Sequence, residues 1–249
     1  MYLTMANCVI KKENLSRIIK DVADIIKDPL DDNNIFYIHD ENSLLNGYAL
    51  IIGPENTPYA NGFYFFHFLF PPDYPYTPPV VKYLTNDGTT RFHPNFYRNG
   101  KCCLSILNTW KGEEWTSCLT IKTILLSLCM VFTDNPLLNE PGVKECSKDI
   151  PVYNDIISFK NIDISIIEVI NKTPYHFFAH LLDVTVKKDI FLDIVNEWFE
   201  KKKKEIMKDL EKRPTRVLNA SISYYDMGSF RIDNSSLLKK FKKIKKAKK

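Results

Sequence analysis

The sequence predicts an α+β fold: a helix, a four-stranded antiparallel meander, an irregular loop and then further helices. Two patterns support this prediction. Apolar residues recur every three or four positions in residues 14–27 and again in residues 120–132, as on the buried face of an amphipathic helix. Between these segments lie short runs rich in aromatic and β-branched residues, separated by turn residues in the manner of an antiparallel meander. Strands that form one run, with helices on either side, are typical of the α+β class.

The first predicted helix, over residues 14–27, has a continuous apolar face. Its positions on that face are Leu15, Ile18, Ile19, Val22, Ile25 and Ile26. Arg17, Lys20 and Asp21 fall outside it, as expected of a helix that packs on a core with one side. Pro29 and the polar residues after it end the helix.

Four short strands are predicted next. They are residues 35–39, 48–52, 63–70 and 80–84. Turns are predicted at Asn46-Gly47, Gly53-Pro54 and Asn61-Gly62, because glycine, proline and asparagine favour turn conformations. The five prolines of residues 71–79 interrupt strand pairing before the last strand.

Residues 86–114 have little periodicity although they contain several large apolar side chains, and a long irregular stretch inside a domain usually has a function. The second helix follows over residues 120–132, with Thr120 as a possible N-cap and Asn135-Pro136 closing it.

The character of the sequence changes after about Pro151. Residues 156–170 and 190–210 have helical periodicity, and no convincing strand pair is visible. We therefore predict a core domain over residues 1–155 and a helical C-terminal extension over residues 156–249, which ends in a Lys-rich tail.

The composition, 45% hydrophobic and 26% charged, is ordinary for a soluble globular protein. No apolar run approaches the ~20 residues needed to span a bilayer, and the first residues lack the layout of a signal peptide. The six cysteines contain no CxxC pair and are expected to be reduced. These features predict a cytoplasmic and/or nuclear location.

The net charge of +4 is unevenly distributed. Residues 239–249 hold eight lysines and no acid, so residues 1–238 carry 26 basic against 30 acidic residues. A mildly acidic body argues against a nucleic-acid-binding core. The tail itself leaves several alternatives open: a disordered solubilising end, nuclear targeting, or contact with acidic lipids or an acidic partner.

A candidate nucleophile lies in the irregular stretch. Cys103 follows Asn95 by eight residues. A thiol is a strong nucleophile with little activation, and an Asn side-chain amide can stabilise the oxyanion of an acyl transfer. No histidine closely follows Cys103 to act as the base that a hydrolase needs. The pattern favours a carrier that holds an acyl group without hydrolysing it.

Simpler interpretations apply to neighbouring residues. Cys102 is expected to be a small core residue whose side chain points away from that of Cys103, because side chains alternate in extended chain. Trp110 is either a contact for a partner or a lid on its own loop. His176 and His180 have the spacing of two ligands on a helix, but no third ligand is near, so we expect no metal site and no cofactor.

Several blocks, in order, resemble the ubiquitin-conjugating enzyme family. They are Gly53–Tyr59, Gly62-Phe63, Pro71–Pro75, Pro78-Pro79, His93-Pro94-Asn95, Cys103–Leu107, Trp115 and Asn135-Pro136. Thr90–Lys101, Ile106–Trp110 and Glu140–Gly142 look like the Z type of this family. The twelve-residue separation of Cys103 and Trp115, longer than in most members, resembles the Z type and a related giant apoptosis inhibitor.

This resemblance implies roles for residues around the candidate nucleophile. Cys103 would form a thioester with the C-terminus of ubiquitin or a ubiquitin-like modifier. Asn95 would stabilise the oxyanion or order the loop that carries it, and His93 would hold that loop rather than act as a base. Glu140 would position or deprotonate the incoming lysine, with Asn139 as the alternative.

The resemblance also implies partner surfaces. It assigns Tyr76, Ser117 and Cys118 to a ubiquitin ligase, Arg17 and Lys20 to the activating enzyme, and Leu126 and Met130 to the donor ubiquitin. A protein substrate would supply the lysine, and no firm nucleic-acid or membrane partner is implied. Two rival classes are a catalytically silent variant that binds ubiquitin or ligases, and a tether to nucleic acid or membrane through the basic tail.

Overall fold

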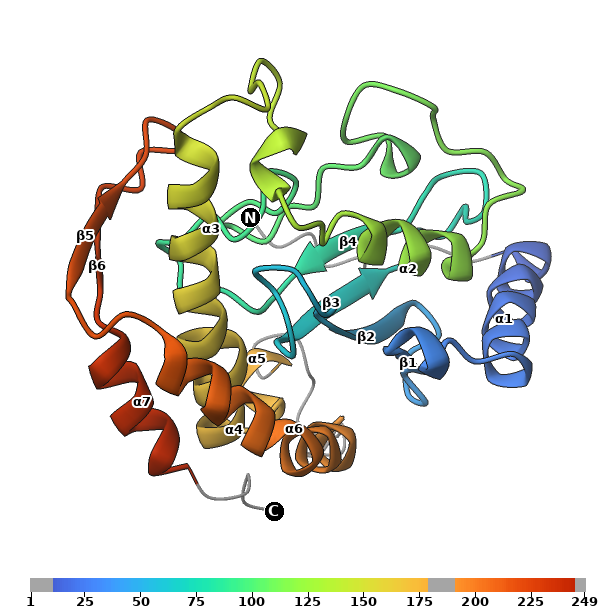
Figure 1. Cartoon of the computed structure of the whole chain (residues 1–249). Helices are drawn as coiled ribbons and strands as arrows, with labels where there is room; N and C mark the ends of the chain where they lie inside the picture. Colours follow the sequence, from blue (N-terminus) through green and yellow to red (C-terminus); the bar gives the residue numbers. More distant parts are fainter. Residues whose placement is uncertain (1–10, 179–190, 245–249) are drawn as a thin grey trace.

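A four-stranded antiparallel sheet lies at the centre of the fold, and the computed structural model describes residues 11–178 and 191–244 of the chain (Figure 1). The strands follow chain order and are β1 (Ile35–His39), β2 (Asn46–Ile52), β3 (Phe63–Leu69) and β4 (Val80–Tyr83). Helix α1 (Lys12–Lys27) precedes the sheet and α2 (Ile121–Met130) follows it. The predicted α+β class is confirmed.

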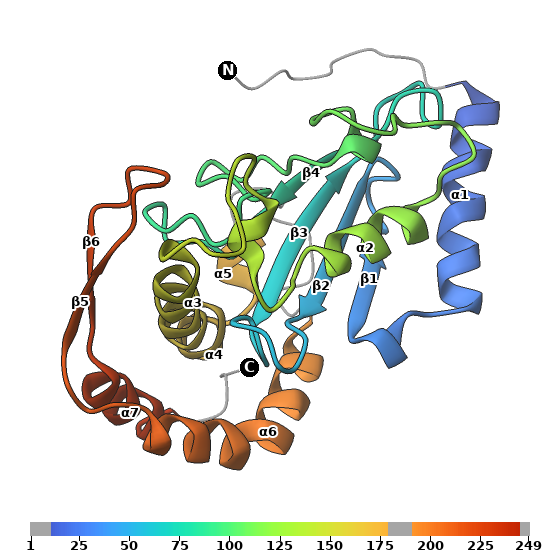
Figure 2. The same cartoon turned by 45° about the horizontal axis from the view of Figure 1, so that its top comes forward.

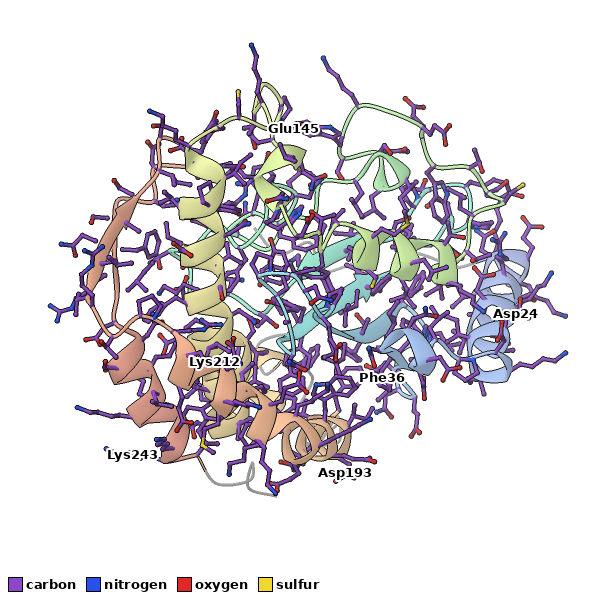
Figure 3. The ribbon with its side chains drawn as sticks, viewed as in Figure 1. Asp24, Phe36, Glu145, Asp193, Lys212 and Lys243 are labelled. Carbon is purple, nitrogen blue, oxygen red and sulfur yellow. The ribbon has the colours of Figure 1, made fainter. Side chains whose placement is uncertain are left out.

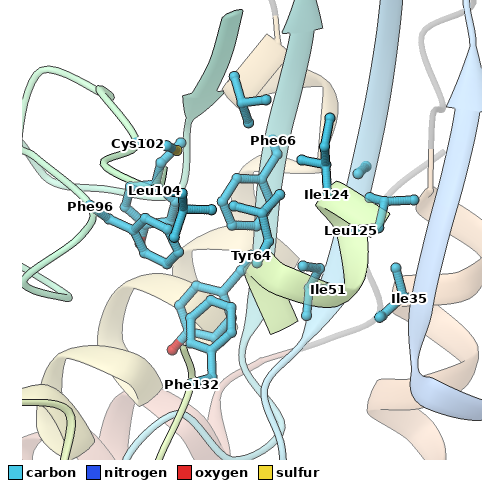
Figure 4. Packing of buried hydrophobic residues seen from close by; sticks show 14 of the residues in the cluster. Ile35, Ile51, Tyr64, Phe66, Phe96, Cys102, Leu104, Ile124, Leu125 and Phe132 are labelled. Carbon is cyan, nitrogen blue, oxygen red and sulfur yellow. The ribbon is translucent and has the colours of Figure 1, made fainter. Parts of the chain in front are cut away.

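One face of the sheet forms a core with α1 and α2. Helix α2 crosses this face of the sheet in Figure 1. Ile51, Tyr64 and Phe66 point into this core from β2 and β3, and Ile124 and Leu125 of α2 pack among them (Figure 4). The loops that follow β4 close the same core, so the irregular stretch is attached directly to the buried side of the sheet.

The boundaries of α2 are set by its caps. The Thr120 side chain accepts a hydrogen bond from the backbone N–H of Thr123, which confirms the predicted N-cap. The helix ends at Met130, two residues earlier than predicted, and Pro136–Asn139 forms a short 3₁₀ turn. This turn leads into the loop that contains Glu140.

The other face of the sheet is covered by the C-terminal part of the chain. Leu50, Ile52 and Phe65 point to this side and form a second core with Phe178 and Phe199, among others. Strands buried on both faces are expected to be nearly continuous in apolar residues, and β2 after Asn46 and β3 apart from His67 have that pattern. The extension is therefore an integral cover for the sheet.

After residue 140 the chain forms α3 (Asp149–Lys160), a π-helical segment (Asn161–Glu168), α4 (Val169–Lys172), α5 (Tyr175–Phe178), α6 (Leu192–Lys212), β5 (Leu218–Ser221), β6 (Ser229–Ile232) and α7 (Asn234–Lys242). The predicted division at residue 155 falls within α3 and stays a prediction. No helix in the described part of the chain is both long and apolar enough to cross a membrane.

The extension is not entirely helical, contrary to the sequence-based expectation. Strands β5 and β6 pair as an antiparallel hairpin, in which Leu218 is opposite Ile232. Each strand has only four residues and one buried side chain, Ala220 in β5 and Ile232 in β6, so the alternation of apolar and polar residues is too short to stand out in the sequence. The hairpin runs beside α3 and packs on its Ile156 (Figure 2).

The predicted turn at Asn46-Gly47 is wrong, because both residues belong to β2. The turn lies just before them, where the backbone N–H of Asn46 donates to the Ser43 carbonyl over 2.9 Å. Gly47 is needed for space: a Cβ at this position would lie 2.1 Å from the Tyr37 hydroxyl oxygen. A glycine at position 47 therefore reflects a close contact with a side chain of the neighbouring strand.

Asp21, predicted on the outer face of α1, is buried. Its carboxylate accepts hydrogen bonds from the Tyr74 hydroxyl and from Nε of Arg17, the latter over 2.8 Å. Two positions assigned to the apolar face, Ile19 and Ile26, are exposed instead. The buried face of α1 is thus rotated towards Asp21, which binds Tyr74 of the proline-rich segment, residues 71–79.

The Lys-rich tail begins as part of the fold. Residues 239–242 belong to α7, and Phe241 and Ile244 are buried in the second core. Figure 3 shows Lys243 on the opposite side of the molecule from Asp24 of α1. A disordered end is therefore excluded for residues 239–244, and residues 245–249 lie outside the described residues.

Candidate active site

Cys103 and Asn95 are joined by reciprocal hydrogen bonds between two neighbouring loop segments. The backbone N–H of Cys103 donates to the Asn95 carbonyl over 2.8 Å. Nδ2 of Asn95 donates to the Cys103 carbonyl over 2.6 Å. A bridge between Phe96 and Cys102 continues this pairing. The spacing of eight residues thus closes a short hairpin-like loop that places Asn95 directly beside Cys103.

A small cavity of about 160 Å³ opens over Cys103. Its lining residues are Arg91, Pro94, Asn95, Tyr97, Cys103, Trp110, Asn139, Glu140, Pro141 and Tyr225. Cys103 is only 3% exposed, so the thiol is recessed at the base of this cavity rather than displayed on the surface. The structure therefore brings Cys103, Asn95 and Glu140 together, with the alternative Asn139 beside them.

Cys102 faces a different part of the molecule. Its side chain lies among buried apolar residues, close to Phe96 and Leu104 (Figure 4). It lines a separate cavity, with Thr77–Lys82 and Leu107–Thr109, that does not include Asn95 or Glu140. Burial raises the pKa of the Cys102 thiol far above its ordinary value, which keeps the thiol protonated. These observations favour Cys103 over Cys102 as the nucleophile.

His93 is fully buried one layer behind the cavity and does not line it. Its Nδ1 accepts a hydrogen bond from the backbone N–H of Asn95 over 2.9 Å. Burial lowers the pKa of His93 to about 3, so the ring is neutral near pH 7. This geometry fits a residue that holds the loop and does not fit a base that reaches the substrate.

Glu140 is half-buried at the cavity wall, after the 3₁₀ turn that follows α2. Its Oε2 accepts a hydrogen bond from the Tyr225 hydroxyl over 2.8 Å. Burial is the main cause that raises the pKa of Tyr225, and the neighbouring Tyr153 and Glu140 raise it further. The Tyr225 hydroxyl therefore keeps its proton and remains a donor. The partner of Glu140 comes from the loop of the β5–β6 hairpin, 85 residues away in sequence.

Sequence reasoning assigned no role to Arg91, Tyr97 or Tyr225. The guanidinium carbon of Arg91 lies 3.4 Å from the Tyr97 ring centroid and 5.1 Å from that of Tyr225. Nε of Arg91 also donates to the His93 carbonyl over 3.1 Å. The pair Tyr224-Tyr225 is visible in the sequence, but no local pattern links it to the cavity, because the contact depends on the fold of the whole extension.

The loop between Cys103 and Trp115 is held by polar side chains. The Thr109 hydroxyl accepts from the backbone N–H of Leu104 over 2.9 Å, and Asn108 accepts from the backbone N–H of Trp115 over 2.8 Å. Trp110 lies at the rim of the cavity and is 46% exposed. Both open alternatives for Trp110, a lid and a partner contact, agree with this position.

The predicted partner surfaces are separate from the cavity. Arg17 donates to the Ser117 and Leu119 carbonyls over 2.6 and 2.7 Å, so it holds the ligase-assigned loop on α1. Lys20 is exposed on α1, and Ser117 and Cys118 are exposed on the loop.

Three further predicted contact residues are accessible. Tyr76 lies within the proline-rich segment, residues 71–79, and is 70% exposed. Leu126 and Met130 lie on α2 away from its buried positions and are 37% and 77% exposed. Their assignments to a ligase and to the donor ubiquitin stay predictions.

No group of three or more His, Cys, Asp or Glu side chains is placed to hold a metal ion within residues 11–178 and 191–244. His176 is exposed, and His180 lies outside the described residues. Within the same ranges Cys102, Cys103, Cys118, Cys129 and Cys146 are free thiols. The expectation that the chain uses no metal or cofactor stays a prediction.

Known proteins resemble this chain over the region that contains the cavity. A sequence model described as ubiquitin-conjugating enzyme matches residues 17–160, more than half of the chain. Ubiquitin-conjugating enzyme E2 Z of Xenopus tropicalis is 42% identical over 157 residues, which cover 62% of this chain and 50% of that protein. The Homo sapiens E2 Z is 42% identical over 158 residues, covering 62% of this chain and 44% of that protein.

A third relative matches a larger share of the chain. The dual E2 ubiquitin-conjugating enzyme/E3 ubiquitin-protein ligase BIRC6 of Homo sapiens is 37% identical over 187 residues, which cover 72% of this chain and 4% of that protein. The chain spans about half the length of the E2 Z relatives that it matches. The sequence resemblance to the Z type is confirmed.

Proposed function

Because the chain belongs to the ubiquitin-conjugating enzyme family, we propose that it carries ubiquitin or a ubiquitin-like protein as a thioester on Cys103 and transfers it to a lysine of a protein substrate. The observation that carries this proposal is the cavity that contains Cys103, Asn95 and Glu140 together. No other cysteine of the described chain lines that cavity.

The first step is transthiolation. The Cys103 thiolate attacks the carbonyl carbon of the modifier's C-terminal thioester on the activating enzyme. A new C–S bond forms to Cys103, the old C–S bond breaks, and the activating enzyme's cysteine leaves as a thiolate. This exchange needs no water and no nucleotide at the site, so ATP would be used upstream.

The second step is aminolysis. The lysine amine attacks the thioester carbonyl, a C–N bond forms, and the Cys103 thiolate leaves with the electron pair of the broken C–S bond. The Asn95 amide is adjacent to the reacting centre and can donate to the oxyanion once it rearranges from the Cys103 carbonyl. Glu140 lines the same cavity as Cys103 and can accept one of the amine's protons.

The same cavity disfavours hydrolysis of the thioester. A hydrolase activates water with a base, commonly a histidine. No histidine lines this cavity, and His93 behind it is buried and neutral. The recessed position of Cys103 also limits the access of bulk water. A long-lived thioester is what a carrier requires.

The partners follow from this proposal: an activating enzyme, the modifier, a ligase and a protein substrate. We also propose a restricted choice of activating enzyme, as the resemblance to the Z type implies, rather than a general-purpose carrier. We also propose that the protein acts in the cytoplasm and/or nucleus, where these components are found.

A loading assay tests the proposal. The chain is incubated with ATP, ubiquitin and each of a panel of activating enzymes, and the products are separated on a gel without reducing agent. The proposal requires an adduct of one ubiquitin that disappears on reduction. If ubiquitin gives none, the panel is repeated with ubiquitin-like proteins. If no activating enzyme and modifier yield an adduct, the binding-only class is favoured.

A further inference from the structure

The loop between β5 and β6, residues 222–228, is attached to the candidate active site by several contacts. Besides the hydrogen bond to Glu140, the Tyr225 carbonyl accepts from Arg98. The backbone N–H of Arg91 lies 3.1 Å from the Met227 sulfur, and the Tyr225 ring lies 6.2 Å from that of Tyr153. Figures 1 and 2 both show the hairpin reaching along α3 towards the loops that precede it.

The backbone of this loop adopts a conformation that non-glycine residues rarely use. Tyr225 has φ 69° and Asp226 has φ 46°, both in the left-handed region. Such conformations persist where surrounding contacts determine them, and they are frequent at functional sites. Here they turn the Tyr225 ring towards the cavity, where it forms part of the wall.

The walls of the cavity match the chemistry of a lysine side chain. Tyr97, Trp110 and Tyr225 supply aromatic surface, and Glu140 supplies a carboxylate. A lysine has a flexible apolar stem of four carbons and a cationic head. Arg91 lines the same cavity, and its guanidinium carbon lies 3.4 Å from the Tyr97 ring centroid and 5.1 Å from that of Tyr225, so these two rings already contact a cation. The stem of the lysine can pack along Trp110 at the rim, while its ammonium group meets the Glu140 carboxylate above Cys103.

We propose that loop 222–228 completes a channel for the acceptor lysine, in which Tyr225 is a positioning residue that orients the Glu140 carboxylate. This inference rests on the proposed function. It gives the C-terminal extension a part in aminolysis, because the extension supplies one wall of the channel and the hydroxyl that holds Glu140.

The proton balance defines what Tyr225 does. The incoming ammonium group loses one proton to the Glu140 oxygen that Tyr225 does not hold, and the free amine then attacks the thioester. After the C–N bond forms, the second amine proton is lost to solvent while the Cys103 thiolate leaves. The hydrogen bond from Tyr225 fixes one carboxylate oxygen and so directs the other towards the amine.

The test separates discharge from loading. Wild-type protein is loaded with ubiquitin, loading is stopped, free lysine is added, and the single-turnover loss of thioester is measured from pH 6.5 to 9. Rates are normalised to the thioester present at the start. Tyr225→Phe retains the ring and removes the hydroxyl. Tyr224→Phe is the matched control, since no hydrogen bond of the Tyr224 hydroxyl contributes to the proposal.

Tyr225→Phe is expected to slow discharge about tenfold at pH 7, a part of the effect typical of a positioned base. The loss is expected to shrink towards pH 9, because a larger share of free lysine is then already deprotonated. In a Glu140→Gln background, Tyr225→Phe is expected to have little further effect. Tyr224→Phe is expected to discharge at the wild-type rate.

Two outcomes would overturn the inference. One is a wild-type rate for Tyr225→Phe at every pH; the other is a loss that is independent of pH and additive with Glu140→Gln, which would indicate a structural role only. Failure of the wild-type protein to load would count against the proposed function itself, and it is recognised in the first step of the experiment.

Discussion

The Asn95 side-chain amide donates a hydrogen bond to the carbonyl of Cys103 over 2.6 Å, while the backbone N–H of Cys103 donates to the carbonyl of Asn95. This reciprocal pair fixes the loop that carries the nucleophile. It also holds the amide next to the position where an oxyanion develops, so the two roles inferred for Asn95 are compatible with one geometry.

Replacing Asn95 separates these two roles. For Asn95→Ala we expect discharge to lysine to slow by ~10²-fold or more, as on removal of an oxyanion donor. Loading from the activating enzyme should fall less if loop order is largely retained. Single-turnover loading and discharge rates are measured alongside the thermal midpoint. Equal losses in both steps together with a large drop in thermal midpoint would mean that Asn95 acts by ordering the loop alone.

Acid should destabilise the fold through His93. Its pKa is lowered to about 3 in the native state, against about 6.5 in the unfolded chain. Between these two pKa values the unfolded state therefore binds one more proton than the native state. Protonation then favours the unfolded state, and stability is lost as pH falls through this window. The free energy of unfolding should decrease by about 1.4 kcal/mol per pH unit from this residue.

Two measurements check the His93 prediction. NMR titration of the wild-type protein should find the His93 ring neutral down to about pH 4, whereas protonation near pH 6.5 would contradict the assignment. Denaturant unfolding between pH 6 and 4 should have a smaller pH slope in His93→Gln than in wild type. His176→Gln, at an exposed position, is the control.

A steric contact links the core to the extension. A Cβ on Gly62 would lie 1.9 Å from Oδ1 of Asn161, at the start of the π-helical segment. That oxygen also accepts from the Tyr64 hydroxyl over 2.6 Å, and Nδ2 of Asn161 donates to the Ala60 carbonyl over 2.9 Å, so it cannot easily move. We expect Gly62→Ala to cost about 1–3 kcal/mol of unfolding free energy.

A double-mutant cycle identifies the cause of this cost. In an Asn161→Ala background the contact with Oδ1 is removed and the contact with Cε2 of Tyr64, at 2.9 Å, remains. Gly62→Ala should therefore cost about 1 kcal/mol less in that background, measured by denaturant unfolding. Gly142→Ala is the matched control: it has φ +87° and nothing within 4 Å of its added Cβ, so its cost should not depend on Asn161. Additive losses at Gly62 and Asn161 would exclude the contact as the cause.

Local patterns in the sequence account for the first half of the site. Apolar periodicity located α1 and α2, and the short separation of Asn95 and Cys103 suffices to bring them together in one hairpin-like loop. The opposed directions of Cys102 and Cys103 follow from the alternation of side chains in extended chain. These features depend on neighbours within about ten residues.

The remaining features depend on contacts across the chain. Tyr225 reaches Glu140 over 85 residues. The chain between them includes helices α3 to α6, a π-helical segment and the first strand of a hairpin whose strands have only four residues each. Gly47 resembles a turn glycine until its contact with Tyr37 is known. One signal in the sequence is the nearly continuous apolar character of β2 and β3, which indicates cover on both faces of the sheet and hence an integral extension.

The assignment of Cys103 as the carrier is tested most directly by locating the modifier. Wild type, Cys103→Ala and Cys102→Ala are loaded under identical conditions and compared on a gel without reducing agent, with the adduct site mapped by mass spectrometry. We predict a reducible adduct of one ubiquitin on Cys103 in wild type, its absence from Cys103→Ala, and its retention in Cys102→Ala. A reducible adduct that persists in Cys103→Ala would contradict the account.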